Sequence, residues 1–301
     1  MIPRKAFAVV TCSAVGVFAC GAGARPTADE VAADILEGTK YRRHAAVANA
    51  VAYGDSILEP LRRRSADFTV MPDDSPLAVV EILVTNPSRT TQATLEELAR
   101  RDSLLPRLVG MAGLALRGLL SVESQGFLMR VAQGAFTTDE ETNAKIAFEG
   151  KQSISEGTLL VYRSLAIAAL GGLGDAAAVE TLEGLLLDRD ELLYERAARA
   201  LCRINGQRAR AALRHVLDTR QSKARGIALQ NLIALGDRDA VGIAIGGIGS
   251  PLLSAELLST LEAVTGQQFG SDSKAWRAWW SAERQRFAPV SAPTCGEHKK
   301  P

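Results

Sequence analysis

The sequence predicts an all-α protein built as a solenoid of stacked helix pairs. Three observations support this fold class: an internal repeat between residues 159 and 249, a helical spacing of apolar residues inside each unit, and turn residues in the same place of every unit. Ala166, Ala197 and Ala228 mark the repeat spacing of 31 residues. A fixed spacing of this size is typical of repeat architectures, in which each unit packs only on its neighbours.

Five columns of apolar residues recur three times each at this spacing. They are Ala166, Ala197 and Ala228; Leu170, Leu201 and Leu232; Leu173, Ile204 and Leu235; Leu182, Leu213 and Ala244; and Leu186, Leu217 and Ile248. The first three columns stand at positions i, i+4 and i+7 of each unit, which places them on one face of a helix. We therefore expect the side chains of the second column to be buried.

Each first helix is followed by a turn signal and a second helix. Gly174-Asp175, Asn205-Gly206 and Gly236-Asp237 interrupt the apolar pattern at equivalent places. Gly or Asn suits the left-handed position that ends a helix, and Asp suits the cap of the next one. Residues 176–187 are an example of a second helix. A single pair cannot bury its apolar face, so the pairs are expected to stack, with the second helices lining the concave surface.

The segments ALGGLGDAAAVETLEGLL and NLIALGDRDAVGIAI resemble short bacterial HEAT-like repeats, the type also found in phycobilisome-lyase proteins. The resemblance covers residues 159–264 best. It implies an α-solenoid scaffold, and it implies no chromophore chemistry and no cofactor. HEAT-like hydroxylases hold iron through paired His-Glu motifs, and this chain has none of those motifs.

The resemblance and the repeat pattern divide the chain into four parts. Residues 1–24 are predicted to be an export signal and tether, 28–158 degenerate HEAT-like helices, 159–287 regular repeats with a cap, and 288–301 a flexible tail. In the degenerate part, residues 41–65 repeat the helix, Gly-Asp and helix pattern, and residues 94–101, 105–120 and 127–133 read as further helices. Residues 137–155 are polar enough for an irregular connection or a charged helix.

All three tryptophans lie near the C-terminus, in the segment KAWRAWW. Trp276, Trp279 and Trp280 share one face of a helix that Asp272 or Ser273 can cap. The segment resembles the terminal helix that closes bacterial HEAT-like arrays, and a solenoid end needs such an atypical unit. The favoured interpretation is therefore a structural plug, and the alternative is an aromatic binding site for a glycan, peptide or base.

The first residues have the layout of a secretory signal: Arg4 and Lys5, a short apolar run, and small residues after it. VFAC, residues 17–20, resembles a bacterial lipobox, which implies lipid attachment at Cys20 and an outer-membrane address. Phe18 departs from the usual small residue of that motif. Ordinary cleavage after Ala24, giving a periplasmic or secreted soluble protein, is the alternative.

Beyond this segment the chain has two cysteines, Cys202 in a helical pattern and Cys295 in the tail. A disulfide between them is one alternative in an oxidising compartment. The favoured interpretation is an isolated buried Cys202 and a solvent-exposed Cys295. Cys295 and His298 together offer only two metal ligands, so we expect no metal site.

No nucleophile–base motif, phosphate-binding loop or zinc motif occurs. The chain carries 35 Lys+Arg and 34 Asp+Glu, so no overall field attracts nucleic acid. Two basic stretches, Arg62–Arg64 and Arg203–Arg225, keep a nucleic-acid-binding solenoid as one alternative, because HEAT-like DNA glycosylases use such faces. An enzyme with an unrecognised site is the other.

The sequence therefore predicts a non-catalytic scaffold that binds a protein or peptide of the cell envelope and contacts the membrane only through its lipid anchor. The second helix of the middle unit carries Arg208, Arg214 and His215, and these are the predicted partner contacts. A surface of mixed charge suits a protein better than a uniformly anionic polymer.

Overall fold

The computed structural model describes residues 25–68, 71, 75–137, 139–140, 156–219, 222–249, 255–290 and 295. The regular elements of this part are helices. Those of the first half are α1 (Ala28–Leu36), α2 (Lys40–Ala50), η1 (Val51–Ile57), α3 (Leu58–Arg64), α4 (Ser75–Thr85), α5 (Arg89–Ala99), α6 (Leu104–Leu116), η2 (Val122–Ser124) and α7 (Gln125–Ala132). Those of the second half are α9 (Glu156–Leu173), η3 (Ala176–Ala178), α10 (Val179–Leu185), α11 (Glu191–Ile204), α12 (Gln207–Leu217), α13 (Ser222–Ala234), α14 (Arg238–Gly246), α15 (Ala255–Thr265) and α16 (Ser273–Glu283). The all-α prediction is confirmed.

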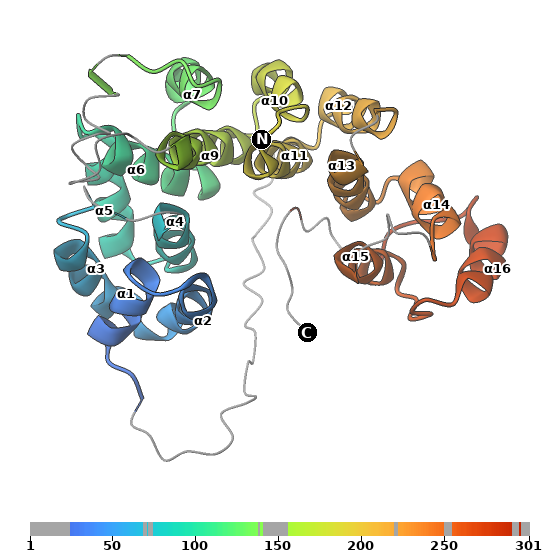
Figure 1. The fold of residues 1–301 in the computed structure, drawn as a ribbon, viewed down its shortest axis with the longest axis horizontal. Helices are drawn as coiled ribbons and strands as arrows, with labels where there is room; N and C mark the ends of the chain where they lie inside the picture. Colours follow the sequence, from blue (N-terminus) through green and yellow to red (C-terminus); the bar gives the residue numbers. More distant parts are fainter. Residues whose placement is uncertain are drawn as a thin grey trace, which may run out of the picture.

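The helices form an arch of two layers (Figure 1). Helices α9, α11, α13 and α15 follow one another along the inner side, and α10, α12 and α14 lie on the outer side. Helices α1 to α6 make one limb of the arch, and α13 to α16 make the other. The first helices of the repeats therefore line the concave side. The prediction that the second helices line it is wrong, because the repeat phase gives the buried face of each helix but not the direction in which the stack curves.

The second repeat column is buried as expected. Leu170, Leu201 and Leu232 each have 0% of their surface exposed. The turns also follow the prediction: Asn205 has a φ of 50°, in the left-handed region, and Asp237 caps α14 by accepting a hydrogen bond from the N–H of Ala240. The spacing of 31 residues thus corresponds to one helix pair, and its apolar columns form the core.

Two adjacent glycines allow the inner layer to pack closely around α9. A Cβ atom on Gly171 would lie 2.7 Å from the Cα atom of Ala200 on α11, and one on Gly172 would lie 2.6 Å from the carbonyl carbon of Ala115 on α6. Both distances are too short for a side chain, since backbone atoms are in contact there. Helix α9 therefore holds α11 on one side and the N-terminal limb on the other.

The N-terminal limb is helical with a degenerate repeat. Gly54, with a φ of 51°, separates α2 from α3 as the Gly-Asp signal predicted, and α5, α6 and α7 occupy the three further segments expected to be helical. Helix α4 was not predicted. Its sequence SPLAVVEILVT is apolar nearly all round, so it lacks the amphipathic spacing of a surface helix, and it is largely buried. The segment at 137–155 lies almost entirely outside the described residues.

Helix α16 packs on α14 at the end of the array. Asp272 caps it by accepting hydrogen bonds from the N–H groups of Lys274 and Ala275. The Trp276 side chain is 0% exposed, its indole N–H donates to the Gly270 carbonyl at 2.9 Å, and its ring meets Phe269 edge to face. Trp279 and Trp280 are half-buried. The Trp-rich cluster is thus present at the C-terminal end, with one ring fully enclosed.

Candidate functional site

The predicted partner contacts lie on α12, in the outer layer of the arch (Figure 1). Two of the three are engaged within the chain: the Arg214 guanidinium pairs with Asp237, and His215 Nδ1 lies 3.2 Å from Glu183. Arg208 is exposed, and among the described residues it has no ion-pair partner. Of the three, only Arg208 therefore has a charge on the outer side that is not paired with another described residue.

The inner side carries a different set of cations, on α11. Arg196, Arg199 and Arg203 stand at i, i+3 and i+7, so they share one face of this helix. The helix is flanked by α9, where Ala200 meets Gly171, and by α13, where Cys202 Sγ lies 3.6 Å from the Asn231 carbonyl. Leu193, Ala197 and Leu201 form the buried face of α11. The three arginines, which we call the inner arginine row, are on the face turned away from that core.

Arg196 is the least solvated member of the row. Its Nε is buried and, within the described part of the chain, has no hydrogen-bond partner. Burial, together with the like charge of Arg199, lowers the pKa of its guanidinium from the ordinary value. Opposing charges that act on it are those of Glu195 on the same helix and Glu81 on α4 in the N-terminal limb. An uncompensated charge in such a place costs on the order of a few kcal/mol.

Other buried arginines of the described chain are satisfied. The Arg43 guanidinium donates to the carbonyls of Ile35 and Gly38. Arg117 donates to the carbonyls of Leu83, in the last turn of α4, and of Asn86, just after it. Arg163 donates to the Ala132 carbonyl and pairs with Asp188. Arg196 differs from these arginines because its buried Nε has no acceptor among the described residues.

The repeat register contains a signal for this row that the motif search missed. Leu165 and Ile227 occupy the positions that correspond to Arg196 in the two neighbouring units. The positions equivalent to Arg199 and Arg203 hold small or uncharged residues: Ala168, Gln230, Gly172 and Ala234. One face of one repeat thus carries three arginines where the neighbouring repeats have apolar, small or uncharged residues. Comparing the charge at equivalent repeat positions would have revealed this difference from sequence.

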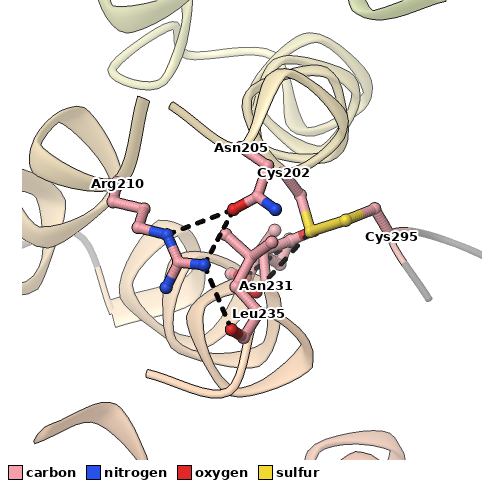
Figure 2. Close-up of a disulfide and its surroundings, with 7 residues drawn as sticks. Cys202, Asn205, Arg210, Asn231, Leu235 and Cys295 are labelled. Atoms are coloured by element: carbon pink, nitrogen blue, oxygen red, sulfur yellow. Dashed lines mark hydrogen bonds between the residues drawn. A yellow bond between two sulfur atoms is a disulfide. The ribbon is translucent and has the colours of Figure 1, made fainter. Parts of the chain in front are cut away.

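A disulfide joins Cys202 on α11 to Cys295 in the tail (Figure 2). The favoured prediction of two unconnected cysteines is therefore wrong. In the predicted tail, the Val290 N–H donates to the Val264 carbonyl at 2.9 Å, and Pro289 lies against Gly236. Sequence alone did not reveal the pairing because the two cysteines are 93 positions apart. Cys295 is no longer available as a thiolate ligand, and His298 lies outside the described residues.

The basic stretch at Arg62–Arg64 is neutralised within the chain. Arg62 pairs with Glu97 at 2.9 Å, and Arg64 pairs with Glu37 at 2.8 Å and with Asp29 at 2.7 Å. Arg62 and Arg101 together lower the pKa of the Glu97 carboxyl. These contacts leave little free charge on α3 for a nucleic-acid backbone.

The structure also bears on catalytic and metal chemistry. A groove between α14 and α16 is lined by Gly242, Arg277, Trp280 and Arg284, among others, and its described lining holds no carboxylate, histidine or cysteine. Over the described ranges, no three His, Cys, Asp or Glu residues come together as metal ligands would. Asp188 and Asp190 are used structurally, in the pair with Arg163 and in the cap of α11.

Residues 160–233 match the sequence profile of the HEAT repeats family. The matched segment spans α10, α11 and α12 and most of α9 and α13, and so contains the inner arginine row. No curated protein matches the chain. The fold and this match together define the class: the chain is an all-α solenoid of stacked helix pairs, and its residues 160–233 are similar to HEAT repeats. The predicted signal and Cys20 lie outside the described residues, and no helix in the described part is long and apolar enough to cross a membrane.

Proposed function

We propose that this protein is an exported, lipid-anchored and non-catalytic scaffold that binds another protein of the cell envelope. The observation that carries the proposal is the arch itself, in which one helix from each repeat contributes to a continuous inner side (Figure 1). Solenoids of this kind use an extended concave surface to hold an extended partner. The described lining of the groove between α14 and α16 holds no carboxylate or histidine that could act as a general base, which favours binding over turnover.

Two features support export to the cell envelope. The first 24 residues follow the layout of a secretory signal, with Cys20 in a lipobox-like context. The Cys202–Cys295 disulfide suits an oxidising compartment, because thiols are kept reduced in the cytosol. In this proposal the acyl chains on Cys20 provide the only membrane contact. At least two chains are needed for stable anchoring.

One experiment tests both the anchor and the binding function. Affinity-tagged protein and a Cys20→Ala variant are expressed in a bacterial host, and the envelope fractions are purified and analysed by mass spectrometry. We expect the parent protein in the membrane fraction, with an acylated Cys20 at its N-terminus and a discrete co-purifying protein. The Cys20→Ala variant is expected to leave the membrane, or to keep its signal uncleaved, while retaining the partner.

Different outcomes contradict different parts of the proposal. A free N-terminus at Arg25 would show ordinary secretion and remove the lipid anchor. Failure to recover a partner, together with hydrolase activity that survives repurification, would replace the scaffold with an enzyme. Co-purification of nucleic acid that depends on Arg208 would favour the nucleic-acid alternative.

A further inference from the structure

We propose that the inner arginine row, Arg196, Arg199 and Arg203 on α11, is a binding site for an extended acidic segment of the partner protein, with carboxylates spaced about three residues apart. This site rests on the proposed scaffold function and specifies its ligand. It differs from the predicted contacts on α12, since it lies in the other layer of the arch.

Arg196 carries a buried donor that the described part of the fold does not satisfy. Its Nε is buried without a hydrogen-bond partner among the described residues, whereas Arg43, Arg117 and Arg163 find acceptors in the fold. Leu165 and Ile227 stand at the equivalent repeat positions, so the architecture itself does not require a cation there. Arg196 is only partly buried as a residue, so an anion that binds the accessible part of its side chain would offset the cost of this poorly solvated charge.

The chemistry and spacing of the row suit a ligand with separated carboxylates. A guanidinium presents a planar fork of N–H donors that matches a carboxylate bidentately. Arg196 and Arg203 are seven residues apart on a helix, which corresponds to about 10 Å at 1.5 Å per residue. Three residues of a polyproline II chain span about 9 Å, and side chains three positions apart lie on the same side of such a chain. Carboxylates three residues apart on an extended peptide can therefore meet the two ends of the row.

Two carboxylates close to the inner arginine row favour a peptide ligand over an anionic polymer. The row is interrupted by Glu195, which pairs with Arg199, and Glu81 on α4 acts on Arg196 from across the inner side. A uniformly charged nucleic-acid backbone would meet these two carboxylates along with the arginines. A peptide with separated carboxylates avoids them, because its uncharged residues can face Glu195 and Glu81.

The test uses a fluorescein-labelled peptide of four Glu-Gly-Ser units and fluorescence anisotropy at low ionic strength. We expect saturable binding to the purified full chain and none for the same peptide with Gln in place of Glu. Arg196→Leu, which installs the type of residue found in the neighbouring repeats, is expected to weaken binding about 30-fold or more. Arg208→Leu is the matched control on the outer layer, and its affinity should stay within about threefold of the parent value.

The melting temperature of Arg196→Leu separates a binding role from a structural role, because the two roles predict changes of opposite sign. Removing an unpaired desolvated charge should raise the melting temperature of Arg196→Leu by about 2–4 °C. A clear fall in melting temperature would show that Arg196 stabilises the fold and would overturn the proposal. Absence of saturable peptide binding, or equal affinity in Arg196→Leu, would also overturn it. Tighter binding of an oligothymidylate that Arg196→Leu abolishes would assign the row to nucleic acid instead.

Failure of the arginine site and failure of the scaffold function give different results. If the envelope partner co-purifies equally well with Arg196→Leu, the scaffold function stands and this site fails. If no partner is recovered but the peptide binds as expected, the site stands and the scaffold function fails.

Discussion

Replacing Trp276 with alanine is expected to destabilise the C-terminal end of the solenoid by about 3–5 kcal/mol. The side chain is 0% exposed and contacts Phe269 and Trp279, so its removal leaves a large cavity. The Gly270 carbonyl also loses the indole donor. Urea unfolding followed by circular dichroism measures the loss, and Lys274→Ala, at an exposed position of the same helix, is the control.

Deletion of residues 274–301 extends this test, with Cys295→Ser as its reference because the deletion also removes the disulfide. If α16 closes the array, its removal should expose the apolar face of α14 and increase the binding of a hydrophobic dye. A truncated protein that unfolds like the full chain but no longer binds a glycan or peptide would contradict the capping role. It would assign the tryptophans to a binding site.

Opening the Cys202–Cys295 disulfide is expected to lower the free energy of unfolding by about 2–4 kcal/mol. The bond closes a loop of 93 positions, and long loops lose the most chain entropy in the unfolded state when they are cross-linked. Cys295→Ser opens the bond with little change to the core, because Cys202 is buried and stays in place. Chemical denaturation of the parent and the variant, with and without a reductant, measures the difference.

The reductant is an internal control for this prediction. It should destabilise the parent protein to the level of Cys295→Ser and leave the variant unchanged. Residues 25–301 contain no other cysteine, so thiol titration of the unfolded protein should detect two thiols only after reduction. Thiols that titrate fully without reductant would contradict the disulfide, and they would remove one support for export.

The sequence was sufficient to predict the helix pairs because the relevant signals are local. The apolar columns follow the helical period, and the turn residues Asn205 and Gly236 adopt the left-handed conformation that their type favours. The burial of Leu201 and the capping by Asp237 follow directly from these positions. Helix α4 was not predicted, because a helix that is buried on most sides lacks that period of apolar residues.

The features that could not be predicted from the sequence depend on contacts between distant parts of the chain. The curvature of the arch decides which layer is concave, and it is set by packing such as that of Gly171 on Ala200. The partners of Arg64 and the pairing of Cys202 lie about 30 to 90 positions away and leave no periodic trace. Arg196 could have been noticed as a charge in an apolar column, but its lack of a partner needed the surrounding helices.

Photo-crosslinking in cells tests most directly whether the inner side of the arch is the partner surface. A photoreactive amino acid is placed at Leu192, which shares the face of the inner arginine row on α11, or at Arg208 on the outer face of α12. After irradiation we expect one discrete adduct with an envelope protein from position 192, and none from position 208. An adduct from position 208 alone, or no adduct from either position in cells that express the protein normally, would contradict the account.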